Sequence, residues 1–140
     1  MSMKIVKPSS SYELVLPEGI IEQPDGRVTS FWVDGEQVLL QVSSYIREEG
    51  RQVTALDRLN DRIKKDSGVW NIWAEKIHLD GSIDQATAEM VDDSGLLWLH
   101  SYLVWPHLTV YSTISGPKEA VRHPDNWARC ALKSVRLRTH

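Results

Sequence analysis

Val28-Thr-Ser-Phe-Trp-Val-Asp-Gly-Glu-Gln-Val-Leu-Leu-Gln-Val-Ser-Ser-Tyr45 contains two apolar runs, 28–33 and 38–45, on either side of Asp34-Gly35. An Asp-Gly pair between two strand-like runs is a strong signal for a β-hairpin. Gly35 can adopt the positive φ that a type I′ turn requires. The pattern therefore predicts an antiparallel hairpin here, and with it a protein built on a β-sheet.

Further strands are predicted on both sides of this hairpin. Upstream, residues 12–16 alternate between apolar and polar or smaller side chains, and Pro17-Glu18-Gly19 ends the run. Downstream, four more runs are typical of strands, separated by turn residues; they cover 69–79, 83–91, 96–105 and 108–114. Short turns between most of them favour antiparallel pairing.

Two helices are expected. Thr54 to Asp66 has a capping-box spacing between Thr54 and Asp57, and an apolar stripe at Leu56, Leu59 and Ile63. A C-terminal helix is expected after Pro124, with Asp125 as its cap. We therefore predict an α+β fold, with a largely antiparallel sheet of six to seven strands, one long central helix and a C-terminal helix packed on the sheet.

Composition limits the class of protein. A chain of 140 residues corresponds to one domain, in which we expect 1–11 to be a loose N-terminal arm. Hydrophobic residues make up 41% and charged residues 25%, which excludes a disordered chain. Cys130 is the single cysteine, so an internal disulfide is impossible. The sequence has neither a signal-peptide pattern nor a membrane-spanning run, so we expect a cytoplasmic protein with no membrane partner.

Tyr12-Glu-Leu-Val-Leu-Pro-Glu-Gly19 resembles the opening strand and turn of the PsbP/Mog1-like superfamily. The expected order of a strand hairpin, a helix, an antiparallel meander and a C-terminal helix is also similar to the α/β/α sandwich of that group. Its members are mostly binding and assembly proteins. The resemblance therefore implies a binding role and supplies no catalytic motif.

The residues themselves point to no familiar catalytic site. Gly-x-Ser-x-Gly, the P-loop and the dinucleotide-binding glycine pattern are all absent. His78 and His100 lie on predicted strands without the spacing of zinc ligands, so only the folded chain could bring them together with Glu89. Ser101 follows His100 directly, and neighbouring strand residues point to opposite faces. We expect no catalytic residue, no metal and no cofactor.

Tryptophan and tyrosine dominate the aromatic residues, with six and four copies against one phenylalanine. The strands from 69 and 96 carry apolar residues on both faces. Such strands fit a sheet covered on both sides, and they also fit a sheet with one face open to a partner. The candidate partner-binding residues are Trp70, Trp73, Trp98, His100 and Tyr102.

Basic residues recur at helical spacing in both predicted helices. They are Arg58, Arg62 and Lys65 in the first, and Arg129, Lys133 and Arg136 in the second. They could form one basic helix face, or they could be solvated side chains that complement the helix dipoles. The net charge of −3 argues against nucleic acid as a partner.

The leading hypothesis is a non-catalytic, bacterial-type accessory domain of the immunity or secretion type, which binds another protein through its aromatic sheet face. One alternative is a small-ligand binder or hydrolase with a pocket lined by Trp70, Trp73, Trp98 and His100. Another is a structural domain that binds itself as a homodimer.

Overall fold

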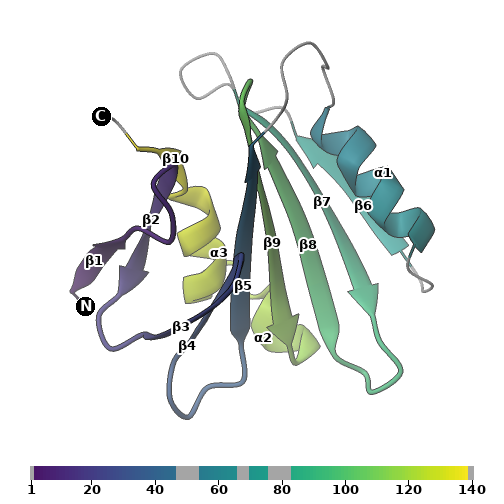
Figure 1. Ribbon diagram of the computed structural model, residues 1–140. Helices are drawn as coiled ribbons and strands as arrows, with labels where there is room; N and C mark the ends of the chain where they lie inside the picture. The colour runs from purple at the N-terminus through teal and green to yellow at the C-terminus, as the bar shows by residue number, and fades with distance from the viewer. Residues whose placement is uncertain (1, 47–53, 66–69, 76–82, 139–140) are drawn as a thin grey trace.

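The computed structural model describes residues 2–46, 54–65, 70–75 and 83–138, with 70–75 described as backbone (Figure 1). The helices are α1 (Ala55–Lys65), α2 (Lys118–Arg122) and α3 (Trp127–Lys133). The strands are β1 (Met3–Val6), β2 (Tyr12–Pro17), β3 (Ile21–Asp25), β4 (Val28–Trp32), β5 (Leu39–Ile46), β6 (Trp70–Glu75), β7 (Asp84–Val91), β8 (Leu97–Val104), β9 (Leu108–Gly116) and β10 (Arg136–Leu137).

The strands form two antiparallel sheets. The larger has seven strands in the order β3-β4-β5-β9-β8-β7-β6, and the smaller has three in the order β1-β2-β10. Every described pair of neighbours is antiparallel. The predicted α+β class and antiparallel sheet are confirmed, whereas the second sheet was not predicted.

The predicted hairpin is formed by β4 and β5, which pair Val28 with Ser43 and Trp32 with Leu39. Its connection, 33–38, is longer than the two-residue turn that the sequence suggested. Gly35 has a φ of 83° inside this loop, where the Glu36 amide donates to the Val33 carbonyl over 3.0 Å. The longer loop places Val38 in the main core, where it is 6% exposed.

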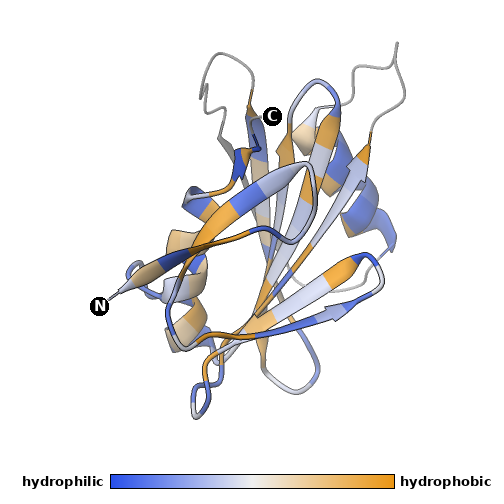
Figure 2. Ribbon diagram, turned by 60° about the vertical axis from the view of Figure 1, so that its left-hand side comes forward, coloured by the Kyte–Doolittle hydropathy of each residue, from blue (hydrophilic) through white to orange (hydrophobic). Residues whose placement is uncertain are grey.

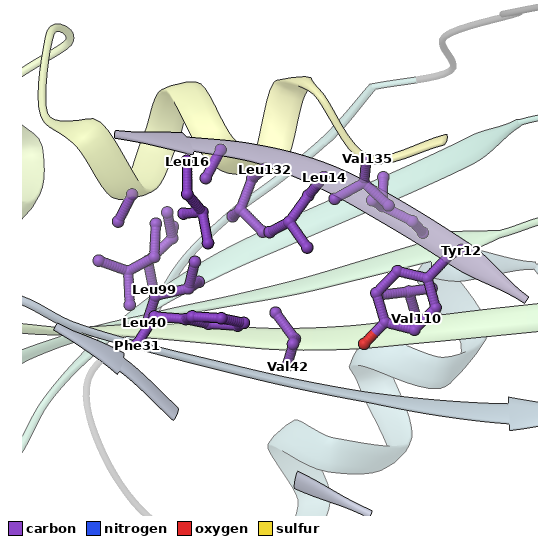
Figure 3. Close-up of a cluster of buried hydrophobic side chains, with 14 of the residues drawn as sticks. Tyr12, Leu14, Leu16, Phe31, Leu40, Val42, Leu99, Val110, Leu132 and Val135 are labelled. Atoms are coloured by element: carbon purple, nitrogen blue, oxygen red, sulfur yellow. The ribbon is translucent and has the colours of Figure 1, made fainter. Parts of the chain in front are cut away.

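The main core lies between the small sheet with α3 on one side and the large sheet on the other. Figure 3 shows Leu14 and Leu16 of β2 directed toward Leu40 and Val42 of β5. These four side chains are at most 1% exposed. Burying a side chain of this size stabilises the fold by about 1.5–3 kcal/mol. The alternation that predicted the strand at 12–16 therefore also identified its core-facing side.

Residues 3–6 of the expected N-terminal arm form β1, which pairs with β2 from Met3↔Pro17 to Val6↔Leu14. On the other edge of β2, Arg136 and Leu137 pair with Glu13 and Tyr12. Both added strands are short, so local pattern alone carried too little signal to predict them.

The prediction of one long central helix is wrong. The helix in the middle of the chain, α1, has 11 residues and packs on β7 and β8, toward one edge of the large sheet. The C-terminal helical segment is divided into α2 and α3, because His123 precedes Pro124 and is extended (φ −62°, ψ 124°). In addition, α3 packs on β2 as well as on β9.

The predicted capping box of α1 is present. The Asp57 amide donates to the Thr54 hydroxyl over 3.1 Å, and the Thr54 amide donates to an Asp57 carboxylate oxygen over 3.3 Å. Leu59 is fully buried, but Leu56 is 39% exposed. Ala55, rather than Leu56, shares the buried face, since 55, 59 and 63 are spaced four residues apart.

The start of α3 differs from the prediction. Its N-cap is Asn126, whose side-chain oxygen accepts from the amides of Ala128 (2.7 Å) and Arg129 (3.2 Å), instead of Asp125. Its buried positions are Ala128, Ala131 and Leu132, and Cys130 is exposed. In Figure 2, α1 is mostly hydrophilic in colour and α3 more hydrophobic, which fits the position of α3 between β2 and the large sheet.

Candidate functional site

The strand register aligns side chains in rows across one face of the large sheet. Paired residues project to the same face, so β8 residues Trp98, His100 and Tyr102 share a face with Tyr111 of β9. We call this the α1 face, because Tyr102 and Val104 pack against α1 there. The two-residue period of β8 also puts Val104 on this side of the strand.

The two faces of the large sheet differ in chemistry. The opposite face, which we call the core face, carries the buried residues Leu97, Leu99, Leu103, Val110 and Ile114. The α1 face is richer in polar side chains; over β5 and β9 these are Gln41, Ser43, Thr109, Tyr111, Thr113 and Ser115. Among the described elements, α1 packs mainly on β7 and β8 and reaches β9 through Arg62, which lies over Tyr111. No described helix packs extensively on β4 or β5, and we call the part of the α1 face over these two strands its open part.

Three side chains form a stacked group beside α1. The rings of Tyr102 and Tyr111 are stacked with centroids 4.6 Å apart. The Arg62 guanidinium carbon lies 4.7 Å from the centroid of the Tyr111 ring, and Arg62 Nε donates to the Tyr102 hydroxyl over 3.3 Å. The cation–π contact and the hydrogen bond tie α1 to the two central strands.

His100 lies next to this group and is 4% exposed. Its Nδ1 is hydrogen-bonded to the Tyr111 hydroxyl over 2.7 Å. Glu89 pairs with Leu99 and so lies on the core face. There its carboxylate forms a 2.7 Å ion pair with the Arg122 guanidinium. The structure therefore does not bring His100 and Glu89 together, and Ser101 likewise lies on the face opposite His100.

Trp98 is held by the loop that precedes its strand. Its indole Nε1 donates to Asp92 Oδ2 over 2.8 Å. Asp92 Oδ1 accepts from the amides of Ser94 (2.9 Å) and Leu96 (3.0 Å) and from the Ser94 hydroxyl (2.6 Å). These hydrogen bonds, first that of the Ser94 side chain and then that of Trp98, lower the pKa of Asp92 to about 2. The pattern of the sequence did not indicate this contact between Asp92 and Trp98.

Two hollows open on the α1 face. The first, here the Trp98 hollow, has a volume of about 260 Å³ and is lined by Val28, Gln41, Val42, Ser43, Trp98, His100, Tyr111 and Thr113. The second, here the α1 hollow, has a volume of about 200 Å³ and is lined by Tyr45, Arg58, Asp61, Arg62, Lys65, Tyr102 and Thr109. Of the two stacked tyrosines, Tyr111 lines the Trp98 hollow and Tyr102 lines the α1 hollow.

Of the predicted partner-binding residues, Trp98, His100 and Tyr102 meet on one face. Trp70 and Trp73 belong to the edge strand β6, which β7 separates from β8. The structure describes only the backbone of these two residues. Sequence reasoning missed the contributions of Val28 and Tyr111. Their positions depend on the pairing Val28↔Ser43↔Tyr111, and no local pattern specifies that register.

The six predicted basic residues do not form one face. Arg58, Arg62 and Lys65 lie on α1, next to the α1 face. Arg129 and Lys133 lie on α3, whose buried residues belong to the core on the other side of the sheet. Arg136 is in β10, where it forms a 2.8 Å ion pair with Glu13 and thereby lowers the pKa of that carboxyl.

Across the described ranges, no three His, Cys, Asp or Glu side chains gather where they could hold a metal ion. His78 falls outside these ranges, so the predicted combination with His100 is not described. None of the described helices combines the length and the apolar character needed to cross a membrane.

No protein-family model matches the chain, and no curated protein matches it in sequence. Solved structures do match. The chain is similar to the solution structure of cyanobacterial PsbP (CyanoP) from Synechocystis sp., with a TM-score of 0.71 and 16% identity over 98% of this chain and 93% of that one. It is also similar to a crystal structure from Bacteroides thetaiotaomicron, with a TM-score of 0.60 and 14% identity over 99% of this chain. The chain covers 48% of that second protein, about half its length. These likenesses show a PsbP-like fold, in agreement with the resemblance found in the sequence.

Proposed function

We propose that this chain, a protein of PsbP-like fold, is a non-catalytic accessory domain that binds another protein through the open part of its α1 face. The observation that carries the proposal is the Trp98 hollow, where an indole, an imidazole and a phenol line one depression beside the open part of the sheet face. Tryptophan and tyrosine are the residue types most enriched at the energetic centres of protein interfaces.

The size of the hollow favours a protein over a small molecule. Pockets for small ligands usually measure about 300–1,000 Å³ and enclose most of the ligand. The Trp98 hollow measures about 260 Å³ and lies on an open sheet face. Val28, which lines it, is 37% exposed, and Tyr45, two residues beyond Ser43 on β5, is 41% exposed, so apolar surface extends past the hollow. A depression of this size suits the insertion of a single side chain from a protein partner.

The polar groups around the hollow add directionality. Gln41, Ser43 and Thr113 supply amide and hydroxyl groups from adjacent strands. Trp98 is itself fixed by Asp92, so a partner would meet an indole that is already oriented. Preorganised contacts of this kind lower the entropic cost of association. A role of the immunity or secretion type and a cytoplasmic location stay predictions from the sequence.

The proposal can be tested with Val28→Glu, which places a charge at the rim of the hollow on a partly exposed residue. Ile5→Glu is the matched control, because Ile5 is 52% exposed and lies on β1 in the other sheet. A partner is first identified by affinity capture with the unmodified chain and then purified. By calorimetry, Val28→Glu should weaken its binding at least about tenfold, whereas Ile5→Glu should not. Equal binding by both variants would contradict the proposal.

Self-association is the competing explanation for an open face. A stable dimer would bury about 1,000 Å² or more in total. Light scattering after size exclusion should show a monomer for the unmodified chain. If the unmodified chain is instead a dimer and Val28→Glu is a monomer, the face binds a second copy of this chain and the proposed partner is wrong.

A further inference from the structure

We propose that the α1 hollow binds an oxyanion, a carboxylate or a phosphate group, between α1 and the sheet. Three cationic side chains line it, Arg58, Arg62 and Lys65, against one acidic residue, Asp61. The local formal charge is therefore +3 − 1 = +2 in a chain whose net charge is −3. This site is separate from the Trp98 hollow and shares none of its lining residues.

The spacing of the cations concentrates their charge. Residues three and four apart on a helix are surface neighbours, and like charges at that spacing repel one another. The helix dipole favours Arg62 and Lys65 in the last turn of α1, but it disfavours Arg58, which lies near the N-terminal end. Asp61, three residues after Arg58 and four before Lys65, offsets part of this repulsion. A bound anion would stabilise all three cationic side chains together.

Two of the cations have no anionic partner in the described part of the chain. The ion pairs found there join Arg122 to Glu89 and Arg136 to Glu13. Arg58 and Lys65 take part in neither. Arg62 plays a different role, since its contacts with Tyr102 and Tyr111 fix it as one wall of the hollow.

The sheet side of the hollow adds a second, independent observation. Thr109 lines the hollow from β9 and is 2% exposed. Its hydroxyl oxygen is buried and finds no hydrogen-bond partner among the described residues. A buried hydroxyl without a partner is unfavourable, and an oxyanion entering the hollow would offer an acceptor from the open side. Tyr45 and Tyr102 bring two more hydroxyl groups to the same lining.

The volume of about 200 Å³ suits one carboxylate or phosphate group rather than a large ligand. The group could come from a free phosphorylated molecule or from an acidic side chain. The two sources can be distinguished by titrating the protein separately with inorganic phosphate and with acetate, at constant ionic strength because exposed charges are screened by salt. Backbone and arginine side-chain NMR signals report where each anion binds.

At least one of the two anions should give saturable shifts confined to α1 and to the strands around Thr109. Saturation by phosphate alone would identify a phosphate-bearing ligand, and saturation by acetate alone a carboxylate-bearing one. Lys65→Gln and Arg58→Gln should each weaken the affinity about tenfold, since each removes a charge-assisted hydrogen bond.

Lys64→Gln is the matched control, because Lys64 is the exposed neighbour of Lys65 on the same helix and does not line the hollow. Its affinity should equal that of the unmodified chain. Equal effects of Lys64→Gln and Lys65→Gln, or the absence of saturable shifts with either anion, would overturn the proposal. The titration uses no protein partner, so it can fail or succeed independently of the proposed function.

Discussion

The indole nitrogen of Trp98 and the carboxylate of Asp92 are joined by a 2.8 Å hydrogen bond that links the β7–β8 loop to the sheet. Asp92 also closes the loop through the amides of Ser94 and Leu96. One carboxylate thus determines both the shape of the loop and the orientation of the largest side chain in the Trp98 hollow.

Asp92→Ala should release the Trp98 indole and lower the thermal stability. The Nε1–H signal of Trp98 in NMR spectra should move toward the position of a solvent-exposed indole, and affinity for a partner at this face should fall. Asp93→Ala is the control, because Asp93 is an exposed carboxylate in the same loop. An unchanged Trp98 signal in Asp92→Ala would show that the hydrogen bond does not orient the ring.

The stability that Asp92 contributes should depend on pH in a defined window. Its pKa in the folded chain, about 2, is below its ordinary value of 3.8. The folded state therefore favours the ionised carboxylate, and the contribution is complete above pH 3.8 and decreases as the pH falls toward 2. The difference in unfolding free energy between the unmodified chain and Asp92→Asn should be constant from pH 5 to 7 and should shrink below about 3.8. A difference that grows on acidification would contradict this sign.

Tyr111→Phe removes the hydroxyl that is hydrogen-bonded to His100 Nδ1 and retains the ring that stacks on Tyr102. Urea unfolding should show a loss of about 1–2 kcal/mol, because a buried imidazole nitrogen loses a hydrogen bond. Tyr45→Phe should have little effect, since Tyr45 is 41% exposed. Equal stabilities of the two variants would mean that the His100–Tyr111 contact contributes nothing measurable.

Asn126→Ala should destabilise the chain by about 1–2 kcal/mol, the usual cost of removing a side-chain N-cap. Asn126 also donates to the carbonyls of Ala120 and Val121, so it connects α3 to α2. Asp125→Ala should be close to neutral in the same urea titration. A larger loss of stability for Asp125→Ala than for Asn126→Ala would contradict this and would identify Asp125 as the cap.

Local signals in the sequence predicted the elements that carry them. The alternation of Tyr12, Leu14 and Leu16 identified β2, and Thr54 with Asp57 identified the start of α1. Asp34-Gly35 marked the β4–β5 hairpin, although the loop proved longer than a two-residue turn. Each of these signals acts over a few residues, which is why reasoning from the sequence alone could use it.

The candidate site depended on information that is not local. Tyr111 reaches His100 and Tyr102 only because β8 and β9 pair in one register, and Val28 joins them through Ser43 of β5. Likewise, no pattern within α1 or α3 states which side of the sheet each helix covers. Trp98, His100 and Tyr102 are the candidates that do meet on one face. They are alternate residues of a single strand, β8, so the local two-residue period was enough to group them.

The central claim is that a protein partner binds the open part of the α1 face. Photo-crosslinking tests it most directly, with a photoreactive amino acid in place of Gln41 at the Trp98 hollow or in place of Lys133 on α3. The account predicts a crosslink to the partner from position 41 and none from position 133. A crosslink from position 133 alone, or from position 41 to another copy of this chain, would contradict it.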